Sequence, residues 1–112
     1  MSFASGILTG KSAIVTGGAT GIGAFIVRKL GALGANVGIV SRKEDNLISA
    51  VQDFKDSDGI DVDWCVGDVR DPEGIKKSFD QLAEKIGGID ILVCNAAGNF
   101  ICPTEELSWN GW

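Results

Sequence analysis

Several residue types are absent or scarce in this chain of 112 residues. It has no histidine, and its three cysteines form no CxxC pair, so we expect neither a structural zinc site nor a disulfide framework, and we expect reduced thiols. No apolar run reaches the roughly 18 residues of a membrane span, and the N-terminus lacks the pattern of a signal peptide. These absences predict a protein of the reducing cytoplasm with no membrane partner.

Positive charge is also scarce. Ten basic and fifteen acidic residues give a formal net charge of −5. An acidic chain without a basic block is poorly suited to bind nucleic-acid backbones, so no nucleic-acid partner is expected. The length suits one domain, 45% of the residues are apolar, and no repeat or interdomain linker interrupts the chain. The sequence therefore predicts a single domain, or part of one, over residues 1–112 and no second domain.

Two hydrophobic patterns alternate along the chain. Short, nearly continuous apolar runs are typical of strands buried on both faces of a parallel sheet. They are Ser12–Thr16, Asn36–Val40, Val62–Val66 and Ile89–Cys94. Between them, apolar residues recur at helical spacing. The three predicted helix faces are Ile22, Phe25, Ile26, Leu30 and Leu33; then Leu47, Val51 and Phe54; then Ile75, Phe79, Leu82, Ala83 and Ile86.

Turn and capping residues agree with this alternation. Gly34 and Gly87-Gly88 are predicted to end the first and third helices. Asp71-Pro72 is typical of an N-cap followed by proline at the first helical position. Ser41 and Glu44 have the spacing of a capping box that would begin the second helix. The order β-α-β-α-β-α-β predicts an α/β fold with a doubly wound parallel sheet.

A glycine-rich turn joins the first strand to the first helix. Gly17, Gly21 and Gly23 lie in the segment Thr16-Gly17-Gly18-Ala19-Thr20-Gly21-Ile22-Gly23. Glycines at such a junction let the backbone approach a pyrophosphate, which the free N–H groups of the helix N-terminus can bind. The sequence therefore predicts a dinucleotide site at this turn. The alternative is a glycine-rich connection that binds no ligand.

The residues after the second strand predict which dinucleotide is bound. An acidic side chain at this place would accept a hydrogen bond from the ribose 2′-hydroxyl of NAD. This chain has Ser41-Arg42-Lys43 instead, a hydroxyl and two cations suited to a 2′-phosphate. NADP(H) is therefore the expected cofactor, and S-adenosylmethionine fits less well. The alternative is a solvated helix start, since Glu44 and Asp45 reduce the local positive field.

The spacing TGxxxGxG resembles the short-chain dehydrogenase/reductase family. That resemblance implies a Rossmann-type domain in which Asp68 and Val69 contact the adenine ring. It also implies that Asn95-Ala96-Ala97-Gly98 supports the sheet centre and lines the cofactor cleft. All of these signals follow successive strands, where a doubly wound sheet binds its ligand. By this resemblance the protein is an NADP-dependent oxidoreductase.

The segment from Asn95 to Thr104 is similar to the 2,4-dienoyl-CoA reductase branch of that family. The resemblance implies reduction of conjugated dienoyl-CoA thioesters by NADPH in fatty acid metabolism, with Arg70, Phe100 and Ser108 facing an acyl-CoA substrate. The alternative roles are a surface arginine, a core phenylalanine and a polar helix-start serine. A 3-oxoacyl reductase of the same family is the alternative function.

The catalytic serine and the Tyr-x-x-x-Lys pair of the family are expected beyond Trp112, and the chain contains no tyrosine. We therefore predict no catalytic or metal-binding residue here and expect the chain alone to be inactive, as the N-terminal part of a Rossmann domain truncated after its fourth strand. A truncated reading frame or a fragment is favoured over a complete enzyme, whose full-length form is expected to be a homo-oligomer. Two alternatives are a non-catalytic NADP(H)-binding module and an interaction role for the open edge of the fourth strand.

Overall fold

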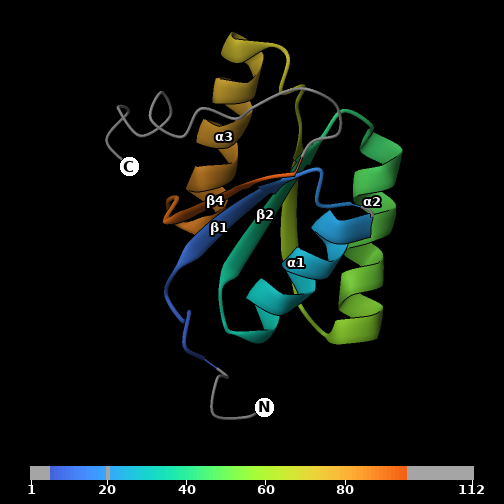
Figure 1. Cartoon of the computed structure of the whole chain (residues 1–112), viewed down its shortest axis with the longest axis vertical. Coiled ribbons are helices and arrows are strands. Elements are labelled where there is room, and N and C mark those ends of the chain that lie inside the picture. The colour runs from blue at the N-terminus through green and yellow to red at the C-terminus, as the bar shows by residue number, and fades with distance from the viewer. Residues whose placement is uncertain (1–5, 20, 96–112) are drawn as a thin grey trace.

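The computed structural model describes residues 6–19 and 21–95, which form a parallel sheet with helices on both faces (Figure 1). The sheet order is β3-β2-β1-β4, and every pairing is parallel. The elements in chain order are β1 (Ser12–Thr16), α1 (Gly21–Ala32), β2 (Asn36–Ser41), α2 (Glu44–Asp53), the π-helical turn η2 (Phe54–Asp58), β3 (Val62–Val66), α3 (Pro72–Ile86) and β4 (Ile91–Cys94). The predicted α/β alternation and doubly wound sheet are confirmed.

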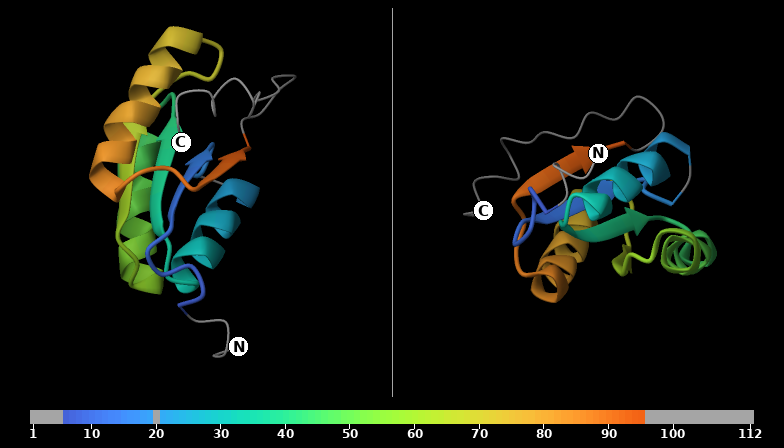
Figure 2. Two further views of the ribbon diagram at one scale, coloured as in Figure 1. Left: turned by 90° about the vertical axis from the view of Figure 1, so that its left-hand side faces the viewer. Right: turned by 90° about the horizontal axis from the view of Figure 1, so that it is seen from below.

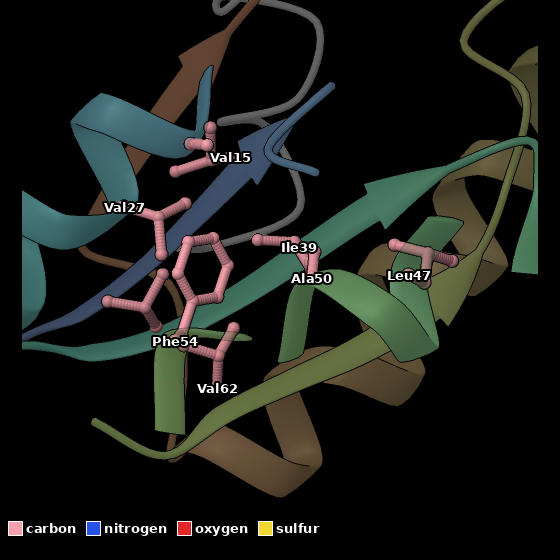
Figure 3. Close-up of a cluster of buried hydrophobic side chains, with 9 residues drawn as sticks. Val15, Val27, Ile39, Leu47, Ala50, Phe54 and Val62 are labelled. Atoms are coloured by element: carbon pink, nitrogen blue, oxygen red, sulfur yellow. The ribbon is translucent and has the colours of Figure 1, made fainter. Parts of the chain in front are cut away.

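The helices divide between the two faces of the sheet. α1 and α2 cover one face and α3 covers the other, which the view from below in Figure 2 makes clear. On the first face the fully buried Val27, Leu47 and Phe54 pack against β1 and β2. Figure 3 shows this cluster, with the Phe54 ring near Val27 and Val62. This packing fixes α1, and with it the turn that precedes α1, relative to the strands.

The second face is packed by α3, as its apolar spacing predicts. Phe79 and Leu82 are buried against Ile14 of β1 and Val40 of β2. Asp71 caps the helix by accepting a hydrogen bond from the Gly74 N–H at 3.2 Å. Pro72 occupies the first helical position, and Gly87 ends the helix in the left-handed region, with φ of 89°. The predicted start and end of this helix are confirmed.

The predicted buried face of α1 is wrong at two positions. The side chains of Ile22 and Phe25 are 71% and 59% exposed, whereas Gly23, Ala24 and Val27 are buried. The helix approaches the sheet through small residues, because a bulkier side chain at Gly23 would not fit against the turn. The spacing of bulky apolar residues therefore predicted the wrong buried side for the first turns of α1.

Two other predicted boundaries need correction. Ser41 does not cap α2: it remains in β2, where its carbonyl accepts the Gly67 N–H at 2.9 Å, and Lys43 occupies the N-cap without a side-chain bond. β4 begins at Ile91 rather than Ile89. The reason is Asp90, whose carboxylate accepts the Ser12 N–H at 2.8 Å while its own N–H donates to the Ser12 carbonyl at 2.8 Å.

The η2 turn was not predicted from the sequence. It extends α2 by one wide turn, and Arg28 of α1 holds it. The Arg28 guanidinium lies 2.9 Å from Asp58 and 2.6 Å from Asp53, and its carbon lies 5.0 Å from the centre of the Phe54 ring. These contacts join α1 to the end of α2 on the side remote from the sheet edge where β2 ends.

The two described cysteines differ in state. Cys65 is a free thiol, as expected, and its sulfur lies 3.2 Å from the Gln81 side-chain oxygen. Cys94 is disulfide-bonded, so the expectation of reduced thiols is wrong for that residue. An odd number of cysteines excludes complete pairing but not a single bond. Within residues 6–19 and 21–95, no helix is long and apolar enough to cross a membrane.

Candidate functional site

The carboxyl ends of the four described strands lie at one edge of the sheet (Figures 1 and 2). This follows from their parallel pairing, in which Thr16 aligns with Val40 and with Cys94. Chain segments that are distant in sequence therefore meet here: the glycine turn, the residues after β2 and β3, and Asn95. An open α/β sheet binds its ligands at this edge.

The glycine turn has a shape that only glycine permits. Gly17 lies in the left-handed region, with φ of 67°, and its N–H donates to the Val40 carbonyl at 2.9 Å. A Cβ on Gly23 would overlap the Gly17 carbonyl oxygen and lie 2.7 Å from the Asn95 side-chain nitrogen. Gly21, with φ of 58°, begins α1, and among the described residues only its chain neighbours and the backbone of α1 come within 4 Å of where a Cβ would be. The turn is thus packed against the protein on one side and open on the other.

The turn is supported by contacts between Thr16, the last residue of β1, and Asn95, the residue after β4. The buried Thr16 hydroxyl oxygen accepts the Asn95 N–H at 2.9 Å, and the hydroxyl lies 3.4 Å from the Val93 carbonyl oxygen. The Asn95 side-chain amide donates to the Gly17 carbonyl at 3.5 Å. Asn95 therefore contacts both the end of β1 and the first residue of the turn, about 78 positions away in sequence.

The residues after β2 combine a half-buried hydroxyl with two exposed cations. Ser41 ends β2 and is held through its backbone by Gly67, whereas Arg42 and Lys43 are exposed before α2 begins. Their positive charges therefore lie at the strand edge next to the turn. The Arg42 charge is one of the causes, the weakest, of the lowered pKa of Asp68, which is consistent with this arrangement.

Asp68 and Arg70 form an ion pair just after β3. The Arg70 Nη2 lies 2.9 Å from the Asp68 carboxylate. Hydrogen bonds from the Arg70 side chain and then from its backbone N–H lower the pKa of Asp68 from 3.8 to about 2. The intervening Val69 is half-buried and packs against the α3 cluster. Asp68 is therefore an ionised acceptor at the edge, and Arg70 is already engaged with it.

Two residues that support this edge were not singled out from the sequence. A Cβ on Gly67 would lie 2.6 Å from the Ser78 hydroxyl oxygen and 2.9 Å from Val40, so only glycine fits there. The buried Ser78 hydroxyl donates to the Val66 carbonyl at 2.8 Å. The Gly-Asp pair at the end of a strand is the sequence signal that marks Gly67, whereas the role of Ser78 depends on how α3 packs.

The predicted site residues fall into two groups. Those in the described chain lie in the glycine turn and the start of α1, where Ala19 is half-buried and Ile22 is exposed, and at or just after the ends of β2, β3 and β4. The remainder lie outside the described residues: Thr20, Ala96, Ala97, Gly98, Phe100 and Ser108. Within residues 6–19 and 21–95, no cluster of three or more His, Cys, Asp or Glu side chains is arranged to hold a metal ion.

The sheet order, the glycine turn and the position of α1 define a Rossmann-type α/β protein. The family model described as short chain dehydrogenase matches residues 11–112. The chain belongs to the short-chain dehydrogenase family.

Named relatives and solved structures agree with this membership. A probable 2,4-dienoyl-CoA reductase of Caenorhabditis elegans is 42% identical over 106 residues, covering 94% of this chain and 34% of the relative. A peroxisomal 2,4-dienoyl-CoA reductase of Arabidopsis thaliana is 37% identical over 110 residues, covering 98% of this chain and 37% of the relative. The chain thus spans about a third of the length of these relatives.

Among solved structures, the actinorhodin polyketide ketoreductase with NADPH superposes with a TM-score of 0.74 at 33% identity. The match covers 87% of this chain and 37% of the ketoreductase. The likeness therefore extends across most of the described sheet and helices.

Proposed function

We propose that residues 1–112 are the N-terminal part of one NADP(H)-binding domain of an NADPH-dependent oxidoreductase. The observation that carries the proposal is the glycine turn, held against β4 by Asn95 and open at Gly21. Arg42 and Lys43 lie at the same edge of the sheet. Family membership and the NADPH-containing ketoreductase structure support the choice of cofactor.

The residues of this edge fit a phosphorylated dinucleotide. At Gly21, apart from its chain neighbours and the backbone of α1, no atom of residues 6–19 and 21–95 lies within 4 Å of where a Cβ would be, which would let a ligand approach the backbone at the start of α1. The first turn of α1 contains no acidic residue, and its free N–H groups and positive dipole end favour a pyrophosphate. The turn residues Gly17, Ala19, Thr20, Gly21, Ile22 and Gly23 would surround this group.

The remaining contacts are assigned by position along the edge. Ser41, Arg42 and Lys43 would bind the 2′-phosphate, because Arg42 and Lys43 are exposed cations beside a hydroxyl. Asp68 and Val69 would border the adenine ring. Asn95 to Gly98 would line the cleft next to the turn. When bound, NADPH supplies a hydride. The residues of this chain would bind and orient the NADPH, and none of them is assigned a catalytic role.

The proposed substrate is a 2,4-dienoyl-CoA thioester. The relatives named as 2,4-dienoyl-CoA reductases support this choice, as does the motif from Asn95 to Thr104. Arg70, Phe100 and Ser108 are the proposed substrate contacts, and Arg70 has five N–H donors, so its bond to Asp68 does not occupy all of them. By this proposal the 112 residues alone bind the cofactor without reducing a substrate.

A 3-oxoacyl reductase is the second candidate function. The likeness to the polyketide ketoreductase favours it, because ketoreduction and dienoyl reduction would share this cofactor-binding half. The two candidate functions are separated by measuring NADPH consumption with a dienoyl-CoA and with a 3-oxoacyl-CoA. The assay uses the natively purified protein after its intact mass has been verified. A preference for the dienoyl-CoA supports the first candidate, and a preference for the 3-oxoacyl-CoA supports the second.

Cofactor binding is tested by calorimetric titration of the 112-residue chain with NADPH, NADH and 2′,5′-ADP. We expect tighter binding of NADPH than of NADH, and Arg42→Ala should remove roughly a tenfold preference, since a charge-assisted contact with phosphate is lost. Lys85→Ala, which removes an exposed cation in the last turn of α3, is the matched control. Equal binding of NADPH and NADH by the unaltered chain would contradict the assignment of Arg42.

Two further proposals concern the whole protein. Assembly into a homo-oligomer is one, and light scattering of the natively purified protein tests it. A cytoplasmic location is the other; the Arabidopsis relative is named as peroxisomal, so microscopy of the tagged native protein should compare these two compartments. If the chain binds NADP(H) but the native protein reduces neither type of substrate, a non-catalytic binding module is the better description.

A further inference from the structure

Arg70 contacts both carboxylate oxygens of Asp68. The Asp68 Oδ1 accepts hydrogen bonds from the Arg70 backbone N–H at 2.9 Å and from Nε at 3.0 Å. The Asp68 Oδ2 accepts from Nη2 at 2.9 Å and is 3.3 Å from Nε. The guanidinium thus meets the carboxylate through two nitrogens, which fixes the plane of the carboxylate as well as its position.

The two side chains differ in exposure. The Asp68 side chain is 34% exposed, about half as much as the Arg70 side chain at 66%. Gly67, just before Asp68, is held between Val40 and Ser78, and Val69, just after it, packs against the α3 cluster. The backbone on both sides of Asp68 is therefore anchored, and the remaining freedom of its side chain is restricted by Arg70.

We propose that Arg70 is a positioning residue for the cofactor: it holds the Asp68 carboxylate in the orientation that accepts a hydrogen bond from the adenine amino group. This inference rests on the proposed function, in which Asp68 borders the adenine ring. A carboxylate offers about four acceptor sites, so the bonds from Arg70 leave room for a further donor. A carboxylate that is already oriented loses less conformational entropy on binding.

This role differs from a contact between Arg70 and substrate. A positioning role makes adenine recognition depend on Arg70 although no atom of Arg70 touches the base. A role as a positive charge alone would affect all anionic ligands equally. The difference can be measured with a cofactor analogue that lacks the amino group.

The experiment is calorimetric titration of the chain with NADPH and with its analogue in which hypoxanthine replaces adenine. The unaltered chain should prefer NADPH by roughly tenfold, the effect of one hydrogen bond to a charged group. Arg70→Ala should abolish most of that preference. Arg70→Lys, which keeps the charge but loses the paired geometry, should also reduce it, whereas Lys85→Ala should leave it unchanged.

The outcomes separate the inference from the function on which it rests. If Arg70→Ala weakens both ligands by the same factor and the preference persists, Arg70 contributes only charge and the inference is overturned. If the unaltered chain binds both ligands equally, Asp68 does not read the adenine amino group, which overturns the inference while cofactor binding stands. If neither ligand binds, the proposed function itself fails.

Discussion

Gly23 determines how closely α1 approaches the end of β1. A Cβ at this position would overlap the Gly17 carbonyl oxygen, and backbone atoms cannot move aside as a flexible side chain can. We expect Gly23→Ala to destabilise the fold by about 3 kcal/mol, the cost of overpacking a tight contact, and to weaken NADPH binding as the turn shifts. Urea denaturation and calorimetric titration of the variant measure the two effects.

Gly21→Ala provides the comparison for this prediction. Gly21 has open space around it, and only its φ of 58° disfavours alanine, so a smaller loss of about 1 kcal/mol is expected. Equal losses for the two variants would mean that the contact between Gly23 and Gly17 does not limit the approach of α1.

The pH dependence of stability should reveal the Asp68–Arg70 pair. The folded-state pKa of Asp68, about 2, lies below the ordinary value near 3.8. The ion pair therefore stabilises the folded chain fully above about pH 4, and this stabilisation is lost as the pH falls towards 2. We therefore expect Arg70→Ala to lower the urea midpoint at pH 7, to differ from the unaltered chain progressively less as the pH falls from 4, and to match it only below about pH 2. In an Asp68→Asn background the same substitution should show no such pH-dependent difference.

At the scale of the elements, two helix starts that look alike in sequence differ in structure. Asp71 caps α3 through its carboxylate, whereas Ser41 ends β2 and caps nothing. Asp71→Ala should therefore cost about 1 kcal/mol of stability, and Asp71→Asn should recover most of it. Ser41→Ala should change stability by no more than about 0.5 kcal/mol. A large loss for Ser41→Ala in thermal denaturation would contradict the assigned start of α2.

Most helices and strands were predicted from the sequence because the apolar runs and capping residues that mark them lie within short segments. β1 is buried at every position, so nearly every residue in Ser12–Thr16 is apolar or small, whereas β3 and β4 are only partly buried. The α3 pattern is regular, with Asp71 and Gly87 at its ends. The buried face of α1 could not be predicted in this way. Near the start of the helix it is defined by close approach at Gly23 rather than by bulky apolar side chains, and that approach involves Gly17 and Asn95, which follow β1 and β4.

The candidate site likewise combines residues that the sequence predicts with contacts that it does not predict. The glycine turn and the residues Ser41, Arg42 and Asp68 were predicted because each lies at or just after the end of a strand, and parallel strands bring such residues to one edge. The contacts that join these segments, such as Thr16 to Asn95 and Gly67 to Ser78, depend on tertiary packing. No pattern within a short window of sequence specifies which of many polar side chains will form them.

At the scale of the whole molecule, the sheet separates two hydrophobic clusters. Leu82 is fully buried in the cluster under α3 and also lies where a Cβ on Gly38 would be, so Leu82→Ala should cost about 3 kcal/mol by leaving a cavity. Ile22 is 71% exposed, so Ile22→Ala should change stability by no more than about 0.5 kcal/mol. Chemical denaturation of both variants measures these losses, and similar values would contradict the packing described for α1.

The pairing of β4 with β1 has a consequence for the order of folding. Ser12 and Asp90 are 78 positions apart, yet they exchange hydrogen bonds at the start of this pairing. Closing so long a loop costs more entropy than the local β1-α1-β2 connection, so β1 should pair with β2 first and with β4 later. During synthesis on a ribosome, the edge of β1 that pairs with β4 would stay unpaired until residues 91–94 emerge. In that period a chaperone or a second nascent chain would have access to this edge.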